Sequence, residues 1–314
     1  MKKPRLVCIG DLMLDVVVRA EVSLEEGTDV PGTVRFRLGG SAGNTCRAFV
    51  ALGGKASFVG AMGTDPLGRR LDSALRDAGV TARLVRVAGT TPRLAALVAP
   101  SGERSFVTER GVADSLAPSA LKPAWFARAD VLHVPAYSLL RPPLSDSSLR
   151  AISLARQNHA LVSVDLASRA PLLAVGADTG LRAVRAAAPD VLFANVDEVT
   201  ALVGRRGAAR LLDLAPVVVV KLGQGGCRVL WRGTGARSVM EIEVATKPIA
   251  AADTTGAGDA FAAGFLYSIV SMASIGEGGF DRAAPSSAAL RRASLAGHKS
   301  AARLLTSRRP ELAL

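Results

Sequence analysis

The feature that most constrains the fold is a series of short apolar runs in the second half of the chain. They span residues 131–134, 161–165, 191–194 and 217–222, and longer stretches with helical character separate them. Strands that alternate with helices in this way are joined by crossover connections, which favour a parallel sheet covered by helices on both faces. The pattern therefore predicts an α/β fold with a doubly wound, mostly parallel sheet.

Length and composition agree with a globular protein. The chain has 314 residues, of which 49% are hydrophobic and only 4% aromatic, so the core must consist mainly of Ala, Val and Leu. We expect one α/β domain over residues 1–314. The apolar runs are too short to cross a membrane, and the basic N-terminus is followed by Asp11 and Asp15 where a secretory signal would stay apolar. We therefore expect a cytoplasmic protein without a membrane partner.

Cysteines and histidines give no sign of disulfides or a metal site. They are few and scattered, without the spacing of metal ligands, so the simplest expectation for the cysteines is partly buried, reduced thiols. The residues are Cys8, Cys46, Cys227, His133, His159 and His298.

The net charge of +12 and the pI of about 10.5 point to an acidic partner. The basic residues form no block of five or six, and the two Tyr and two Trp are too few for a stacking platform. We therefore expect no specific nucleic-acid binding, and a phosphate-rich substrate accounts for the charge.

The stretch 253–261, with the sequence DTTGAGDAF, carries the strongest chemical signal. Small residues before an apolar helix leave backbone N–H groups unpaired at the positive end of the helix dipole, which is a site for phosphate. Asp259 lies in the first helical turn, where it could accept a proton from an attacking hydroxyl. A lone Asp at this position more often only stabilises the helix start.

A second glycine-rich stretch, Gly39-Gly40-Ser41-Ala42-Gly43-Asn44, follows a predicted strand and opens a predicted helix. Its glycines allow close approach of the backbone to a ligand, and Asn44 offers a donor and an acceptor to a sugar diol. The same residues also match Gly-x-Ser-x-Gly, the nucleophile elbow of serine hydrolases, with Ser41 as nucleophile. A hydrolase would leave the stretch 253–259 without a role.

Further polar residues follow predicted strands, where open α/β sheets bind ligands. Asp15 comes soon after the strand at 5–9 and is equally consistent with a turn. Asn195 and Glu198 have the spacing of a helix capping box. Lys221 begins a turn whose glycines, Gly223 and Gly226, could simply join two strands.

Taken together, these motifs resemble the ribokinase-like carbohydrate kinases, also called the PfkB family, over nearly the whole chain. The resemblance implies a ribokinase-like fold and an ATP-dependent kinase of a sugar or sugar derivative. Asp259 would be the catalytic base, and Gly256, Ala257 and Gly258 would form the anion hole. Asp15, Gly39, Gly40 and Asn44 would bind the acceptor.

The resemblance also implies how ATP is held. Mg²⁺ would be bound near Glu198 through water, and K⁺ is a further cation that the family uses. The nucleotide would contact a set of residues spread over the second half of the chain, namely Asn195, Lys221, Gly223, Gly226, Thr254, Ser294 and His298. The residues Asp165 and Arg169 match a family motif only in part, since Leu166 and Ala167 replace its Pro and Asn.

Two β segments, about 16–37 and 90–110, resemble the family's lid over the sugar, and Arg104 would be a lid cation on the substrate. Family members pair such lids between subunits, so we expect a homodimer. Phe106 is the only aromatic of the lid hairpin, which favours a plain sugar over a nucleoside as acceptor. The remaining alternatives are a nucleoside kinase, a hydrolase that uses Ser41, and a sugar sensor without activity, against which the intact Asp259 argues.

Overall fold

The computed structural model describes residues 3–101, 104–233, 238–251, 253–274, 285–307 and 310–313. Its largest element is a nine-stranded sheet with the order β13-β12-β11-β10-β9-β8-β1-β4-β5. The strands are β1 (Arg5–Ile9), β4 (Lys55–Gly63), β5 (Thr81–Val87), β8 (Val131–Pro135), β9 (Leu161–Asp165), β10 (Val191–Asn195), β11 (Val217–Lys221), β12 (Cys227–Arg232) and β13 (Val239–Val244). All neighbours pair in parallel from β11 to β5, and β12 and β13 are antiparallel.

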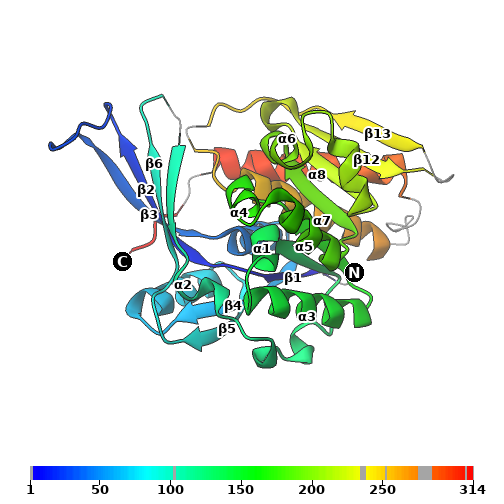
Figure 1. The fold of residues 1–314 in the computed structure, drawn as a ribbon, viewed down its shortest axis with the longest axis horizontal. Helices are drawn as coiled ribbons and strands as arrows, with labels where there is room; N and C mark the ends of the chain where they lie inside the picture. The colour runs from blue at the N-terminus through cyan, green and yellow to red at the C-terminus, as the bar shows by residue number, and fades with distance from the viewer. Residues whose placement is uncertain are drawn as a thin grey trace.

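Helices cover both faces of this sheet (Figure 1), which confirms the predicted doubly wound architecture. One face packs against α1 (Ser41–Ala51), α2 (Pro66–Asp77), α7 (Ala257–Ser274) and α8 (Ser287–Thr306). The other packs against α3 (Leu144–Gln157), α4 (Arg169–Ala174), α5 (Ala177–Ala187) and α6 (Val196–Val203). Alternate residues of β11 enter the two cores, Val219 on the α7 side and Val220 on the α6 side.

A separate four-stranded sheet projects from the body, at the upper left of Figure 1. Its order is β3-β2-β6-β7, with β2 (Met13–Ala20), β3 (Gly32–Gly39), β6 (Arg93–Val98) and β7 (Arg104–Glu109). The two expected lid segments thus meet in one sheet, although β2 begins before residue 16 and β3 continues to Gly39. We call this sheet the lid.

Two connections show how local sequence starts a helix. The chain passes from β3 into α1 through Gly40, whose φ of 90° and close approach to the Asp11 carbonyl leave no room for a side chain. Asp65 caps α2 by accepting a hydrogen bond from the Gly68 N–H at 2.7 Å.

Short 3₁₀ helices complete the connections, at Gly111–Asp114, Pro118–Ala120, Pro123–Trp125, Ala136–Leu139, Ala208–Asp213 and Gly223–Gly225. The three cysteines are free, as the sequence predicts, and they are buried rather than partly buried. Within the described part of the chain, no helix is both long and apolar enough to cross a bilayer.

Candidate active site

The carboxyl ends of the parallel strands bring distant polar residues to one edge of the large sheet. Asp165 ends β9 and Asn195 ends β10, where it pairs in register with Lys221 at the end of β11. A cleft of about 1040 Å³ opens above this edge and extends beneath the lid. Ligands of open α/β sheets bind at this position, so the cleft is the candidate active site.

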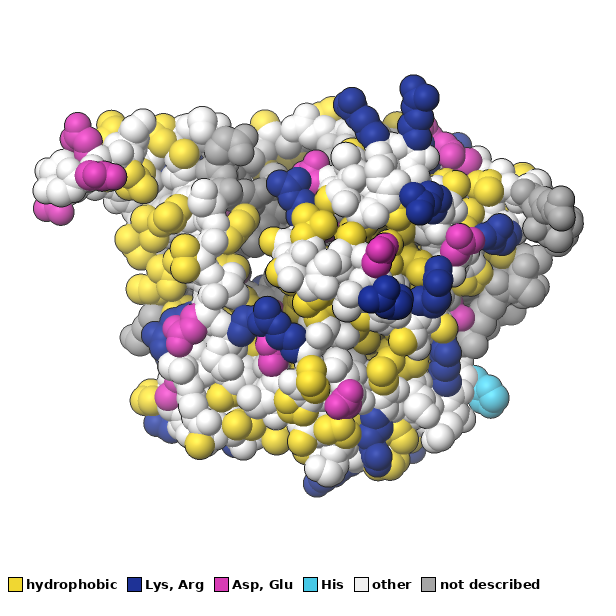
Figure 2. Space-filling model, viewed as in Figure 1, with side chains coloured by type: hydrophobic (Ala, Val, Ile, Leu, Met, Phe, Trp, Pro, Cys, Tyr) yellow, Lys and Arg dark blue, Asp and Glu magenta, His cyan; other side chains and the backbone are white. Residues whose placement is uncertain are grey.

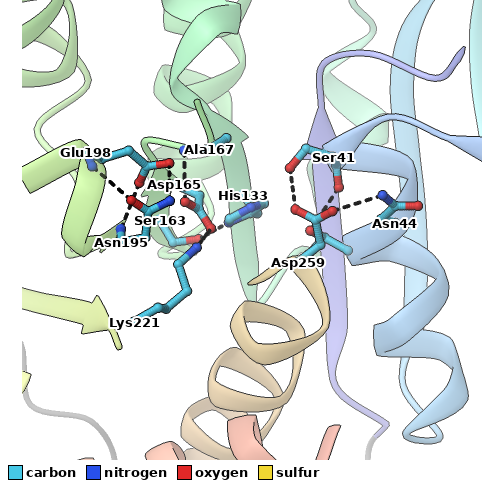
Figure 3. Close-up of polar contacts among 11 residues, drawn as sticks. Ser41, Asn44, His133, Ser163, Asp165, Ala167, Asn195, Glu198, Lys221 and Asp259 are labelled. Carbon is cyan, nitrogen blue, oxygen red and sulfur yellow. Dashed lines mark hydrogen bonds and ion pairs between the residues drawn. The ribbon is translucent and has the colours of Figure 1, made fainter. Parts of the chain in front are cut away.

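Asp259 lies in this cleft, in the first turn of α7. Its carboxylate accepts hydrogen bonds from Ser41 Oγ at 2.5 Å and from Asn44 Nδ2 at 2.9 Å (Figure 3). Burial raises the pKa of Asp259 to about 6, although these two hydrogen bonds oppose the shift. The group is therefore ionised at neutral pH but basic enough to accept a proton.

The loop before α7, which is the candidate phosphate cradle, turns sharply into the helix. Gly256 adopts a φ of 74°, and a turn is closed by a hydrogen bond of 3.1 Å from the Ala257 N–H to the Thr254 carbonyl. The first helical hydrogen bond runs from the Ala260 N–H to the Gly256 carbonyl. The N–H of Gly258 therefore lies before the regular series of hydrogen bonds within the helix. A Cβ at residue 258 would lie 3.2 Å from Lys221 Nζ, which places an ammonium group beside this amide.

Acceptor candidates lie on the lid side of the same cleft. Burial, followed by the negative charge of Asp11, raises the pKa of Asp15 to about 7. Gly39 lies against this carboxylate, since a Cβ there would be only 2.1 Å from Asp15 Cγ. Asp15, Gly40 and Asn44 line the cleft, whereas Gly39 supports Asp15 from outside the lining.

Asn195 and Glu198 form a reciprocal capping box at the start of α6. The Glu198 N–H donates to Asn195 Oδ1 at 2.8 Å, and the Asn195 N–H donates to Glu198 Oε2 at 2.8 Å. The side chains of both residues nevertheless line the cleft, and burial raises the pKa of Glu198 to about 7. The capping geometry and a role near phosphate are therefore compatible at this position.

Lys221 makes an ion pair that the motif analysis did not predict. Its Nζ lies 2.6 Å from Asp165 Oδ2, and both side chains are at most slightly exposed. Burial acts to lower the pKa of Lys221, but the charges of Asp165 and Glu198 outweigh it and raise the pKa above its usual value. The lysine is therefore held as a cation at the floor of the cleft. The position of Asp165 at the end of a predicted parallel strand could have indicated a site residue. No role was assigned to it, because it matches the family motif only in part.

The remaining nucleotide candidates separate into two groups. Thr254, Gly223, Gly226 and His298 line the cleft. Ser294 lies outside that lining, because it is fully buried and its hydroxyl donates to the Leu290 carbonyl at 2.9 Å. For Arg104, only the backbone position in β7 is described, and its side chain lies outside the described residues.

A second network at the acceptor end was also missed. Tyr137 Oη donates to Asp11 Oδ1 at 2.5 Å, and the Arg110 guanidinium lies 5.1 Å from the centre of the Tyr137 ring. Asp11, Tyr137 and Arg110 line the cleft. Asp11 follows β1 directly and could have been proposed on that ground, but no local pattern links it to residues more than 90 positions away.

Ser41 and the histidines lack the geometry that a serine hydrolase needs. Ser41 is the first residue of α1 with no positive φ, whereas a nucleophile elbow holds its serine in a strained turn. Its hydroxyl donates to a carboxylate. Of the three histidines, His133 is bonded to Ser163, His298 contacts the Val244 carbonyl, and His159 is exposed at the end of α3.

Comparison with known proteins identifies the family. The model of the pfkB family of carbohydrate kinases matches residues 3–310. The chain belongs to this family. As a pfkB carbohydrate kinase it is a phosphotransferase, and the sequence-based assignment of the family and of the enzyme class is confirmed.

Relatives of this pfkB kinase include plant fructokinases. It is 30% identical to probable fructokinase-5 of Arabidopsis thaliana over 281 residues, which cover 85% of this chain and 83% of the relative. Fructokinase-1 of Oryza sativa subsp. japonica is 32% identical over 284 residues, covering 84% and 83%.

Solved structures confirm the ribokinase-like fold. Adenosine kinase from Sinorhizobium meliloti superposes with a TM-score of 0.79 at 24% identity, covering 98% of this chain and 96% of that one. Fructokinase from Xylella fastidiosa, solved with bound ATP, gives a TM-score of 0.77 at 24% identity and covers 98% and 94%.

Proposed function

We propose that this pfkB kinase transfers the γ-phosphate of ATP to a hydroxyl, most simply a primary one, of a neutral sugar, with fructose as the first acceptor to test. The observation that carries the proposal is the position of Asp259. Its carboxylate lies between the phosphate cradle of α7 and the acceptor side chains of the lid side. The fructokinase relatives support fructose over other sugars.

In the proposed mechanism, Asp259 removes the proton of the attacking hydroxyl. Its pKa of about 6 lets it remain ionised at neutral pH, and Ser41 and Asn44 hold the carboxylate oriented toward the acceptor. The amides of Gly256, Ala257 and Gly258, with the dipole of α7, would stabilise charge on the transferring oxygens. Asp15, Gly40 and Asn44 would bind the other hydroxyls and so position the reacting one.

Mg²⁺ fits the opposite side of the cleft, where Glu198 would contact it through water. Among the described residues no group of three or more His, Cys, Asp or Glu side chains is arranged to hold a metal directly. Mg²⁺ usually keeps several waters and binds through few carboxylates, so a single buried Glu suits it. When bound, it would neutralise phosphate charge, and Lys221 would add a further positive charge beside Gly258. No residue is assigned to K⁺, although a fructokinase from Vibrio cholerae was solved with potassium bound.

We rank a sugar above a nucleoside as the acceptor. On the cleft face of the lid, Phe106 is accompanied by small or aliphatic side chains, Val17 and Ala96. At the far end, the ring of Tyr137 is covered by Arg110 and its hydroxyl is bonded to Asp11. Phe106 is the lid ring on which a purine could stack, but we rank a nucleoside second because the matched relatives are fructokinases.

The lid also carries the proposed dimer contact. Val34 and Val107 are 57% and 66% exposed, and register places both on the face of the lid that does not line the cleft. Figure 2 shows hydrophobic surface over this projecting sheet, while basic side chains elsewhere on the visible face are scattered among acidic ones. Exposed apolar strands of this kind are suited to pairing with a second copy.

The decisive experiment is ADP release from Mg-ATP with fructose, ribose, other sugars and nucleosides as acceptors. Asp259→Asn should lower turnover with the preferred acceptor by about 10²–10⁴-fold, the range for loss of a general base. Near-normal turnover in this variant would refute the role of Asp259. Ser41→Ala serves as the second variant, since ester hydrolysis lost only there, with no kinase activity, would establish the hydrolase instead.

A further inference from the structure

Arg37 joins the lid to the loop that precedes α7. It lies on β3 directly opposite Asp15 in the strand register, so its side chain emerges on the cleft-facing side of the lid. Its guanidinium forms an ion pair with Asp253, which is more than 200 residues away in sequence. The two side chains are only 17% and 22% exposed. Nothing in the motifs of either segment predicts this pair.

Asp253 transmits this contact to the backbone of the phosphate cradle. Its Oδ2 pairs with the Arg37 guanidinium, while its Oδ1 accepts a hydrogen bond of 2.9 Å from the Thr255 N–H. Thr255 is followed immediately by Gly256, whose positive φ turns the chain into α7. The carboxylate that fixes this turn is therefore itself fixed by a residue of the lid.

The Arg37 contact completes a row of three side-chain contacts between two short segments. Residues 37–44 run from the lid into α1 and carry Arg37, Ser41 and Asn44. Residues 253–259 carry the two carboxylates that these side chains meet, Asp253 and Asp259. These contacts connect the acceptor side of the cleft to its phosphate side at both ends of the segment 253–259.

The neighbouring residues of β3 are anchored as well, to the C-terminal residues. Arg35 pairs with Glu311 at 3.0 Å, and the Leu312 N–H donates to the Phe36 carbonyl at 2.8 Å. In Figure 1 the red C-terminal segment ends beside the base of the lid strands. β3 is therefore held to the C-terminal residues by exposed contacts and to the loop before α7 by Arg37.

We propose that Arg37 is a positioning residue that couples the lid to the phosphate cradle. It acts through Asp253, so that the turn at Thr255–Gly256 takes its catalytic shape only while the base of β3 is in place. This inference rests on the proposed function. A charge-assisted pair in a partly buried setting is suited to this role, because removal of one partner leaves the other charge poorly solvated and the turn less constrained.

Steady-state kinetics with Mg-ATP and the preferred sugar tests the coupling. Arg37→Ala should lower kcat by roughly 10-fold or more, since misplacement of groups by about 1 Å can cost up to ~100-fold, while the KM for sugar changes by less than about threefold. Arg37→Lys keeps the charge and should recover part of the loss. The matched control is Arg35→Ala, on the same face of the same strand, whose exposed ion pair contributes little.

A double-mutant cycle identifies the route through Asp253. If Arg37 acts through this carboxylate, the variant carrying both Arg37→Ala and Asp253→Ala should be no slower than Asp253→Ala alone. Independent losses that multiply would overturn the proposed route.

Amide hydrogen exchange of the peptide over residues 253–260 gives a readout without turnover. Arg37→Ala should accelerate exchange there, and Arg35→Ala should not. If the wild-type protein phosphorylates no acceptor, the proposed function fails, yet the exchange result still tests Arg37. If the wild type is active and Arg37→Ala matches Arg35→Ala in both kcat and exchange, only the coupling is wrong. Should Arg37→Ala not fold, Arg37→Lys and Arg37→Gln carry the same comparison.

Discussion

At the scale of single residues, the cleft contains two aspartates whose pKa values are raised. Asp259 and Asp15 both bind protons more tightly than exposed aspartates, because burial disfavours their charged forms. Around Asp259, the donors Ser41 and Asn44 limit this effect, so the pKa stays near 6. A base poised just below neutral pH combines a high ionised fraction with useful proton affinity.

The pH dependence of turnover follows from Asp259. A general base acts only when it is deprotonated, so kcat/KM for the sugar should fall as pH decreases through about 6. Replacing Asn44 by Ala removes a hydrogen bond that favours the ionised form, which should move this acidic limb to higher pH. A kcat/KM profile measured from pH 5 to 8.5 checks both. A profile that stays flat down to pH 5 would contradict Asp259 as the base.

At the scale of elements, α7 is positioned by unusually close contact with α8. A Cβ at Gly264 would lie 2.5 Å from the Ala296 carbonyl oxygen, and a Cβ at Gly297 would lie 2.8 Å from the Phe261 ring. These two glycines allow the helices to pack backbone against backbone. The N-terminus of α7, and with it Asp259, is set by this contact.

Gly264→Ala should therefore destabilise the protein. The added methyl group meets backbone that has little freedom to move, and overpacking of this kind typically costs about 1–3 kcal/mol. Thermal unfolding provides the measurement, with Gly225→Ala as control, because a Cβ there would make only an ordinary contact of 3.5 Å with Leu222. Equal melting temperatures for the two variants would show that α7 and α8 can separate without penalty.

The start of α6 predicts a second stability effect, with a defined sign. The folded protein binds the Glu198 proton more tightly than the unfolded chain does, since the pKa rises from 4.5 to about 7 on burial. Stability from this group is thus greatest at low pH and decreases as pH rises between those two values. Glu198→Gln keeps an acceptor for the capping box but removes the charge.

We therefore expect Glu198→Gln to melt at a higher temperature than the wild type at pH 8, by a few degrees for an effect of order 1 kcal/mol. The difference should shrink at pH 5, where the wild-type carboxyl is largely protonated, and kinase turnover should fall at both pH values. Circular dichroism melts at the two pH values measure the first effect. A variant less stable than the wild type at pH 8 would contradict the unfavourable burial of this charge.

At the scale of the whole molecule, the lid and the body enclose the cleft, and the lid exposes apolar side chains away from it. If two lids pair, wild-type protein should elute with the mass of two chains. Val107→Glu places a charge in the proposed contact and should yield single chains by size exclusion with light scattering. Leu173→Glu, an exposed leucine on α4 away from the lid, is the control. A monomeric wild-type protein at micromolar concentration would refute the lid dimer.

The sequence by itself determined the fold class and most of the motif positions, for physical reasons that are local. Short apolar runs alternating with helices predict a parallel sheet, and the carboxyl ends of its strands are where Asp165, Asn195 and Lys221 lie. Asn195 acts as the cap that its position predicted, because a cap depends only on the next three residues.

Only the tertiary structure decided which of these residues meet. The pairs Arg37–Asp253 and Lys221–Asp165, and the bond from Tyr137 to Asp11, join residues that are far apart in sequence. Ser294 was a nucleotide candidate through the family resemblance, but the packing of α8 buries it, and its hydroxyl donates to the Leu290 carbonyl one turn earlier in the same helix. Periodicity gives the faces of an element, whereas the packing of all elements together sets the direction of each side chain across the cleft.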